Sequence, residues 1–168
     1  MLDRFFPTYD FPRACDITPE FLRTEGIRAI ISDLDDTLTC HDSQELAPEY
    51  RAWMEQITAA GIRFCILSNN SEERTRPFCD RNGLDFTAHA RKPLRKAALE
   101  TLDRLGVSRD EALLVGDQIF TDILCGKNAG IRTAAVRPIG SRATKFIAVK
   151  RFLERPIWRA YFRRKEDK

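Results

Sequence analysis

Features that would assign the chain to a membrane or secreted class are missing from the sequence. No apolar run approaches the roughly 18 residues that span a bilayer. The chain begins Met1-Leu2-Asp3-Arg4, with an acid where a secretory signal needs a basic end and an apolar stretch. Its composition, 43% hydrophobic and 32% charged, is typical of a globular protein. We therefore expect a cytoplasmic protein, and 168 residues predict one domain over residues 1–168.

Patterns for several common ligand sites are also absent. The five cysteines include no C-x-x-C pair, and their odd number at irregular spacing argues against a zinc knuckle or a disulfide framework. The two histidines, His41 and His89, lack metal-ligand spacing, and we interpret His41 as a loop residue. Neither G-x-x-x-x-G-K-[ST] nor G-x-G-x-x-G occurs, which argues against a nucleotide cradle of either type.

Short apolar runs alternate with helix-like segments along the chain. Strands are predicted at Ile27–Leu34, Ile62–Ser68, Phe86–Ala88, Ala112–Gly116 and Thr133–Val136. The runs around Ile30, Ile66 and Leu114 are almost continuously apolar, which is typical of parallel strands covered on both faces. One helix is predicted from Pro48, with its apolar positions on one face. These positions are Tyr50, Trp53, Met54 and Ile57.

Two further helices complete the alternation. The helix from about Ser71 contains Pro77, which predicts a kink or a later start. The helix from Pro93 places an apolar stripe at Leu94, Ala98, Leu102 and Leu105. The alternation indicates an α/β fold, a three-layer doubly wound domain with a mainly parallel five-stranded sheet. Its core is predicted at about residues 25–140, followed by a C-terminal extension at about 141–168.

Polar residues follow four of the predicted strands, where this type of fold places its site. They are Asp33, Asp35, Asp36 and Thr37 after the first strand, Ser68, Asn69 and Asn70 after the second, Lys92 beyond the third, and Gly116, Asp117 and Asp122 at the fourth. Each has an ordinary alternative role as a turn, cap or surface residue. Their joint occurrence at four strand exits favours a site at one edge of the sheet.

The chemistry of this set indicates phosphoryl transfer. A cluster of carboxylates without histidine or cysteine favours a hard cation, most simply Mg²⁺. Asp33 is predicted to attack phosphorus and form an aspartyl-phosphate, and Asp35 to act as the acid and then the base. Lys92, Ser68 and Asn69 are predicted to bind phosphate oxygens. Thr37 and Gly116 are interpreted as residues that shape the loops.

These motifs resemble the haloacid dehalogenase (HAD) superfamily of phosphatases. The pattern D-x-D-x-T is Asp33-x-Asp35-x-Thr37, the second motif is Ser68, the third is Lys92, and the fourth is Gly116-Asp117-x-x-x-x-Asp122. More narrowly, the Asp-Leu-Asp-x-Thr-Leu, Leu-Ser-Asn-Asn, Lys-Pro and Gly-Asp-Gln-x-x-Thr-Asp segments resemble subfamily IIIA, the YqeG-type branch. That resemblance extends to residues 144–155. The branch includes phosphatases of phosphatidylglycerophosphate.

The resemblance implies roles for the acidic residues. Asp33 and Asp117 would bind Mg²⁺ by their side chains and Asp35 by its backbone carbonyl, while Asp122 would support the metal directly or through water. Position 36 departs from the pattern, because Asp36 stands where the superfamily usually has Gly and this branch often Asn. Aspartate can adopt the turn conformation needed there. Both mechanistic aspartates remain, so we do not interpret Asp36 as inactivating.

No separate cap domain is predicted over the site. The interval between Ser68 and Lys92 holds 23 residues, enough for one helix and one short strand, whereas an independent lid needs on the order of 50. An open site cannot select a small metabolite by enclosing it. It suits a phosphate displayed on a protein, on a nucleic acid end or on a lipid headgroup.

The C-terminal extension is basic and aromatic. Residues 145–168 hold nine Lys or Arg and three Asp or Glu, a net charge of +6 within a total of +3. Positions 146, 149, 153 and 157 share one helical face, although Pro156 predicts a break. Such a segment is typical of a peripheral contact with an anionic membrane surface. The aromatic residues near the N-terminus, Phe5, Phe6, Tyr9 and Phe11 beside Leu2, form a second candidate contact.

Two alternatives for the tail stay open. Both ends of the chain pack on the body with their charges facing water, or the tail binds nucleic acid, for which no recognition module is evident. The favoured interpretation is a Mg²⁺-dependent phosphatase of phosphatidylglycerophosphate at the inner membrane face. Its rivals are a phosphatase of a soluble metabolite or phosphoprotein, and a non-enzymatic adaptor that keeps the fold.

Overall fold

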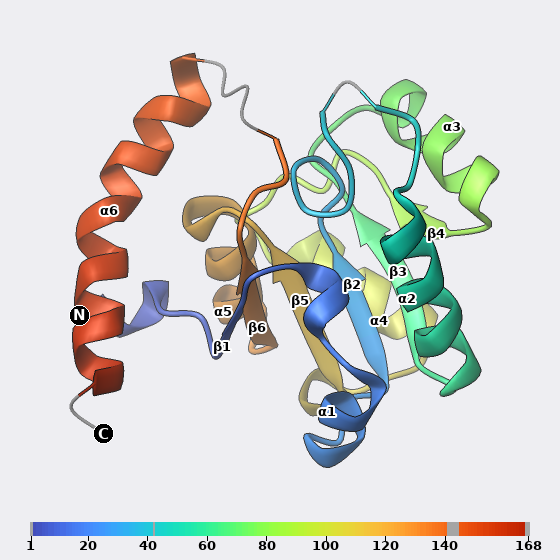
Figure 1. The fold of residues 1–168 in the computed structure, drawn as a ribbon, viewed down its shortest axis with the longest axis horizontal. Helices are drawn as coiled ribbons and strands as arrows, with labels where there is room; N and C mark the ends of the chain where they lie inside the picture. Colours follow the sequence, from blue (N-terminus) through green and yellow to red (C-terminus); the bar gives the residue numbers. More distant parts are fainter. Residues whose placement is uncertain (1, 42, 141–144, 167–168) are drawn as a thin grey trace.

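The chain folds around one parallel sheet (Figure 1). The computed structural model describes residues 2–41, 43–140 and 145–166, with side chains from 148 onward in the last segment. The strand order is β1-β6-β5-β2-β3-β4, and every neighbouring pair is parallel. The strands are β1 (Tyr9–Phe11), β2 (Ala29–Ser32), β3 (Arg63–Leu67), β4 (Asp85–Thr87), β5 (Ala112–Gly116) and β6 (Arg132–Val136).

The α/β class and the parallel sheet are confirmed, and the predicted count of five strands is wrong by one. The sixth strand, β1, pairs with β6 in the register Tyr9 to Ala134 and Phe11 to Val136. It is only three residues long, Tyr-Asp-Phe, and lacks the apolar run by which β2, β3 and β5 are recognised. Tyr9 and Phe11 pack against Phe21 with ring centroids 5.0 and 5.2 Å apart.

Helices cover both faces of the sheet. They are α1 (Pro19–Thr24), α2 (Pro48–Ala59), α3 (Glu72–Asn82), α4 (Lys96–Leu105), α5 (Leu124–Ala129) and α6 (Lys145–Glu166). Successive residues of a strand point to opposite faces, so Ile30 joins the core with α1, α2 and α3, whereas Ile31 joins the core with α4 and α5. The predicted apolar face of α2, Tyr50, Trp53, Met54 and Ile57, is buried.

Two helix predictions need correction. Helix α3 runs from Glu72 to Asn82 through Pro77, so the later start is wrong, while the kink stays a prediction. Phe78 and Cys79 beside the proline are fully buried and hold that turn in place. Helix α4 begins at Lys96 rather than at Pro93. Leu94 therefore precedes the helix and is 60% exposed, while Ala98, Leu102 and Leu105 are buried as expected.

The predicted break in the C-terminal helix is wrong as well. Helix α6 is continuous through Pro156, although a proline inside a helix removes a hydrogen bond and costs about 3 kcal/mol. Glu154 and Ile157, on either side of the proline, are both buried, and this packing holds the helix together. In Figure 1 α6 stands along the side of the sheet that ends in β1. Within the described part of the chain, every helix is too short or too polar to cross a membrane.

The predicted stripe at 146, 149, 153 and 157 is divided between two environments. Ile157 is 6% exposed, whereas Val149 and Leu153 are 57% and 53% exposed, and the Phe146 side chain lies outside the described residues. The inner face of α6 packs with the N-terminal segment. Phe5 and Phe6 join Ile119, Ile123 and Ile157 in one cluster. The N-terminal aromatic rings therefore pack on the body of the protein, as one alternative for the ends of the chain requires.

Candidate active site

The C-terminal ends of three neighbouring strands form the floor of the candidate site. Asp33 follows β2, Ser68 follows β3 and Asp117 follows β5, and these strands are adjacent in the sheet. The backbone N–H of Asp33 donates to Val115 O at 2.8 Å, which extends the β2–β5 pairing up to the site. A pocket of about 170 Å³ opens here and is lined by Asp33, Asp35, Ser68, Asn69, Lys92 and Asp122, among others.

Lys92 joins two carboxylates at the centre of this pocket. Its Nζ lies 2.7 Å from Asp33 Oδ1 and 2.7 Å from Asp122 Oδ1. Its side chain is 2% exposed, so it is no ordinary surface lysine. Asn69 holds its main chain in place, because Asn69 Oδ1 accepts the Lys92 N–H at 2.7 Å and Asn69 Nδ2 donates to Lys92 O at 3.1 Å. The Asn69 side chain thus positions Lys92.

Burial and mutual repulsion weaken the acidity of the carboxyl groups. Burial raises the pKa of Asp33 to about 7 against the opposing attraction of Lys92, with Asp122 and Asp35 adding to the rise. Burial, the negative charge of Asp122 and that of Asp33 raise the pKa of Asp117 well above its usual range. The raised pKa values of Asp33 and Asp117 indicate that the protein alone does not neutralise the negative charge of the site.

The acidic groups fit a divalent cation. One carboxylate oxygen each from Asp33, Asp117 and Asp122 lies within 4.8 Å of the others, and all three residues are buried. Asp117 Oδ1 is buried and has no hydrogen-bond partner among the described residues. An unpaired buried oxygen is costly, and a metal ion bound by hard oxygen ligands would satisfy it. The predicted contribution of the Asp35 backbone carbonyl stays a prediction.

Gly116 is required by the position of Asp122. A methyl group at Gly116 would overlap the Asp122 side chain, so a larger residue cannot stand there without moving this acid. Asp122 is fully buried, and its Oδ2 accepts the Gln118 N–H at 3.0 Å. Asp122 lies in a π-helical segment, Ile119–Ile123, that leads into α5, and such segments are frequent at functional sites.

Asp35 has a separate set of partners. Its carboxylate accepts hydrogen bonds from Asn70 Nδ2 and from Arg74 of α3, and His41 Nδ1 lies 3.5 Å away. Burial raises its pKa, which Arg74 and His41 oppose and Asp36 reinforces. Asp35 is thus oriented by a cation and an amide, whereas Asp33 faces the lysine. The two aspartates therefore occupy different environments, as separate roles require.

The residues after Asp35 form the expected tight turn. Asp36 has φ of 61°, the left-handed conformation that aspartate tolerates better than most residues. Its N–H donates to Thr39 O at 2.7 Å, and its carbonyl accepts from Ile139 at 2.8 Å. Thr37 is fully buried in this turn, and its N–H donates to Leu34 O. Ser68 is 1% exposed and its Oγ accepts the Asn70 N–H at 3.1 Å.

Sequence reasoning missed three residues of the site. Arg74 approaches Asp35 from α3. Arg151 of α6 lies 3.4 Å from both Asp36 Oδ2 and Asp117 Oδ2. Glu154, 3% exposed, accepts the N–H groups of Ile119 and Phe120 and thereby docks α6 beside the site. Both α6 residues lie in the C-terminal extension, whose basic composition and apolar stripe carry no signal for an inward-facing arginine.

Comparisons with known proteins identify the family of the chain. The sequence pattern of the haloacid dehalogenase-like hydrolases matches residues 13–130. The chain belongs to this family. It is 34% identical over 165 residues to the probable phosphatase YqeG of Bacillus subtilis, a match that covers 98% of this chain and 96% of that protein. The chain is accordingly a phosphatase of the HAD family.

Two more distant similarities bear on substrate and fold. The phosphatidylglycerophosphate phosphatase 1 of Arabidopsis thaliana is 26% identical over 137 residues, which cover 76% of this chain and 39% of that protein. The cobalt-bound deoxy-D-mannose-octulosonate 8-phosphate phosphatase of Haemophilus influenzae superposes with a TM-score of 0.53 at 17% identity. The superposition covers 82% of this chain and 90% of the Haemophilus protein. The latter similarity shows the shared fold.

The raised pKa values predict a pH-dependent effect of metal on stability. Between the unfolded pKa near 4 and the folded pKa of about 7 for Asp33, the metal-free native state binds more protons than the unfolded state. Its free energy of unfolding should therefore fall as pH rises through this window, with up to roughly 4 kcal/mol of the fall due to Asp33. Mg²⁺ should bind more tightly at pH 8 than at pH 5, and at 100-fold its Kd it adds about 2.7 kcal/mol.

Urea unfolding between pH 5 and 8, with EDTA and with Mg²⁺, measures this linkage. Asp117→Asn is the metal-site control and should lose most of the Mg²⁺ effect. Stabilisation by Mg²⁺ that does not change with pH would contradict the assignment of these carboxyl groups to the metal.

Proposed function

We propose that the chain is a Mg²⁺-dependent phosphomonoesterase that acts through an aspartyl-phosphate on Asp33. The observation that supports this most is the buried Asp33 carboxylate, 2.7 Å from Lys92 Nζ and grouped with Asp117 and Asp122. A carboxylate nucleophile must meet an anionic phosphate, so positive charge is needed beside it. Lys92 supplies a fixed part of that charge.

The proposed reaction has two steps. Asp33 Oδ attacks phosphorus, the bond to the leaving oxygen breaks, and the Asp35 carboxyl donates its proton to that oxygen. The Asp35 carboxylate then accepts a proton from water, which attacks the aspartyl-phosphate and releases inorganic phosphate with Asp33 restored. The raised pKa of Asp35 favours the protonated form that the first step requires.

The phosphate oxygens and the metal would use the remaining groups. Lys92, the Ser68 hydroxyl and the backbone at Asn69 are the proposed phosphate ligands, with Thr37 and Gly116 shaping the loops around them. Mg²⁺ would be held by Asp33, Asp117 and the Asp35 carbonyl, with support from Asp122. When bound, it would supply the positive charge that offsets repulsion between the carboxylates and the phosphate.

We further propose phosphatidylglycerophosphate at the inner membrane face as the substrate. The similarity to a protein named phosphatidylglycerophosphate phosphatase supports the headgroup. The outer face of α6 supports the membrane, because Val149, Phe152 and Leu153 are 57%, 63% and 53% exposed at helical spacing. Apolar side chains exposed on a basic helix are typical of contact with anionic lipid. We infer that residues 1–168 work as one domain, with the extension at 141–168 as its membrane element.

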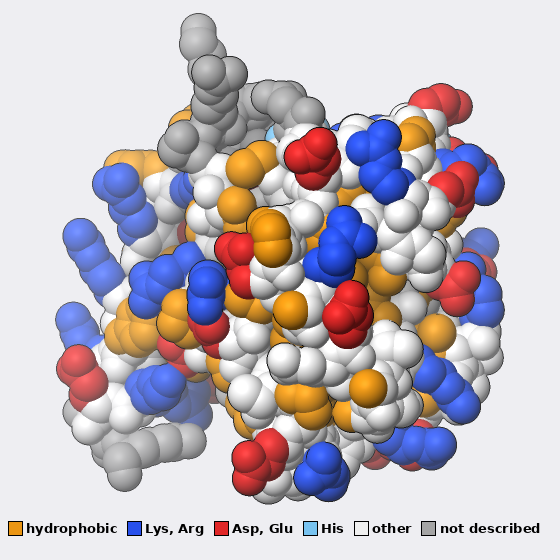
Figure 2. All heavy atoms as spheres, turned by 45° about the vertical axis from the view of Figure 1, so that its right-hand side comes forward, with side chains coloured by type: hydrophobic (Ala, Val, Ile, Leu, Met, Phe, Trp, Pro, Cys, Tyr) orange, Lys and Arg blue, Asp and Glu red, His pale blue; other side chains and the backbone are white. Residues whose placement is uncertain are grey.

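Basic residues accompany this apolar face. Arg155 lies over the Phe152 ring, 5.6 Å from its centroid, and Arg159 and Arg163 are exposed further along the same side of the helix. Figure 2 shows Lys and Arg side chains interleaved with hydrophobic ones on the side of the molecule where α6 stands. Each basic group near an anionic surface contributes about 1 kcal/mol.

Phosphate release from three compounds tests the proposal. Short-chain phosphatidylglycerophosphate, glycerol 3-phosphate and an aryl phosphate are compared with Mg²⁺, in the presence and absence of anionic vesicles. We expect preference for the lipid and retention of the protein on vesicles. Hydrolysis of the aryl phosphate alone would support the phosphatase activity and contradict the lipid as substrate. A soluble metabolite or a phosphoprotein would then be the favoured substrate.

A further inference from the structure

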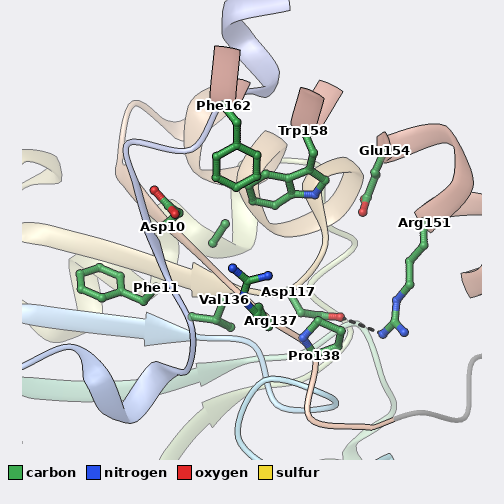
Figure 3. A pocket seen from close by; sticks show the side chains of 11 residues that line it. Asp10, Phe11, Asp117, Val136, Arg137, Pro138, Arg151, Glu154, Trp158 and Phe162 are labelled. Carbon is green, nitrogen blue, oxygen red and sulfur yellow. Dashed lines mark hydrogen bonds and ion pairs between the residues drawn. The ribbon is translucent and has the colours of Figure 1, made fainter. Parts of the chain in front are cut away.

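A second pocket adjoins the catalytic one beneath α6. Its volume is about 270 Å³, compared with about 170 Å³ for the catalytic pocket. One wall consists of Phe11, Val136 and Pro138, from β1 and the end of β6. The opposite wall consists of Trp158 and Phe162, which project from α6 (Figure 3) and stack at 5.5 Å between ring centroids. We name this hollow the α6 pocket.

The α6 pocket and the candidate active site have no lining residue in common among those described, but they meet at Asp117, which is grouped with Asp33 and Asp122. Asp117, one of the candidate metal ligands, lines the α6 pocket. Arg151 extends from α6, and its guanidinium lies 3.4 Å from Asp117 Oδ2. Figure 3 shows this ion pair at one end of the pocket, with the aromatic rings of Trp158 and Phe162 at the other. The aromatic wall therefore lies beyond Asp117 and Arg151 for a molecule whose phosphate reacts at Asp33.

The charges of the α6 pocket favour an anion. Two of its three acidic groups have donors of their own: Asp10 accepts from Tyr161 at 2.9 Å and from Lys165 at 2.6 Å, and Glu154 accepts two backbone N–H groups. The third, Asp117, faces Arg151 at 3.4 Å and belongs to the proposed metal site. The Arg137 guanidinium, by contrast, forms no ion pair with any residue in the described ranges. An exposed arginine beside an apolar wall complements an anionic group attached to an apolar chain.

We propose that the α6 pocket is the leaving-group subsite of this phosphatase. It receives the diester phosphate of the substrate at Arg137 and Arg151 and an acyl chain between Val136, Trp158 and Phe162. The inference rests on the lipid phosphatase proposed above and adds to it. Helix α6 then has two functions, because its outer face contacts the bilayer while its inner face holds one chain of the substrate.

Chain-length selectivity with dissolved substrates tests the pocket without a membrane. Short-chain phosphatidylglycerophosphate below its micelle concentration is compared with the deacylated molecule, which keeps both phosphates. For the wild type, removal of the chains should lower kcat/KM roughly tenfold or more, since each buried methylene contributes to binding. Phe162→Ala and Trp158→Leu should bring this ratio close to one. Arg137→Gln should instead reduce the preference for the deacylated diester over glycerol 3-phosphate.

Phe152→Ala is the matched control for Phe162→Ala. Phe152 lies on the same helix but faces outward, 63% exposed against 40% for Phe162, and it does not line the pocket. The Phe152 variant should bind vesicles less well and keep the wild-type chain-length ratio. An equal loss of the ratio in both variants would overturn the proposal, because the chain would then be recognised by the outer face of α6.

A binding measurement separates the pocket from the reaction. In Asp33→Asn protein, short-chain phosphatidylglycerol with brominated chains should quench the fluorescence of Trp158, and Trp158→Phe should lose that quenching. The other tryptophan, Trp53, is 3% exposed on the buried face of α2 and should contribute none of it.

The outcomes distinguish this inference from the proposed function. Hydrolysis of acylated and deacylated substrates at equal rates would overturn the proposed role of the α6 pocket and leave the proposed phosphatase activity standing. Quenching without hydrolysis of any lipid would support the pocket and reject the proposed reaction. Absence of both would overturn both proposals.

Discussion

Asp33→Asn is expected to abolish phosphate release, with kcat falling roughly 10⁴-fold or more, because an amide cannot form the acyl phosphate. The substitution keeps the size of the side chain and removes a charge that is costly to bury, as the raised pKa of Asp33 shows. The metal-free variant should therefore unfold at the same temperature as the wild type at pH 8, or higher. The measurements are phosphate release with saturating Mg²⁺ and thermal unfolding in EDTA.

The matched control is Asp80→Asn, the same substitution at an exposed position of α3. It should leave phosphate release and the unfolding temperature at the wild-type level. An Asp33→Asn enzyme that retains more than about a tenth of the wild-type rate would show that Asp33 is not the nucleophile. If the variant were inactive in the test tube yet fully functional in cells, the adaptor alternative would gain support.

The sheet edge was predictable because its elements are local in the sequence. Buried parallel strands require continuous apolar runs on both faces, and β2, β3 and β5 have them. Polar residues that follow such runs must then meet at one edge, which is where the structure places Asp33, Ser68 and Asp117. This reasoning needs only strand direction and adjacency.

What escaped prediction depends on long-range packing. β1 is three residues long and is stabilised by pairing with β6, more than 120 residues later. The continuity of α6 through Pro156 depends on the burial of Glu154 and Ile157 against distant elements. Arg74 and Arg151 reach the aspartates from α3 and α6, and the amphipathic pattern of a helix does not show which of its arginines faces a site. Such contacts are set by tertiary geometry, which single-residue propensities do not encode.

Lys92→Ala is expected to cost both activity and stability. The lysine side chain is 2% exposed and joins Asp33 and Asp122 at 2.7 Å each. Removal of one partner from a buried ionic group leaves the carboxylates uncompensated, which destabilises a protein by about 3–5 kcal/mol. The loss of a fixed positive charge beside the phosphate should also lower kcat by roughly 10²-fold or more. Urea unfolding in EDTA and phosphate release with Mg²⁺ measure the two effects.

Two further variants identify the cause of the instability. Lys96→Ala, four residues later, removes a lysine whose side chain is 85% exposed and 3.8 Å from Glu100, and it should change stability little because exposed ion pairs contribute little. Adding Asp122→Asn to Lys92→Ala removes one of the carboxylates left without its cation. The double variant should therefore be about 1 kcal/mol or more stable than the sum of the two single effects on the free energy of unfolding predicts. Mg²⁺ should also recover part of the loss in Lys92→Ala alone, since the cation compensates the same carboxylates. Strict additivity of the two substitutions would mean that Lys92 stabilises the fold by packing, and that the charge balance of the site is maintained by other residues.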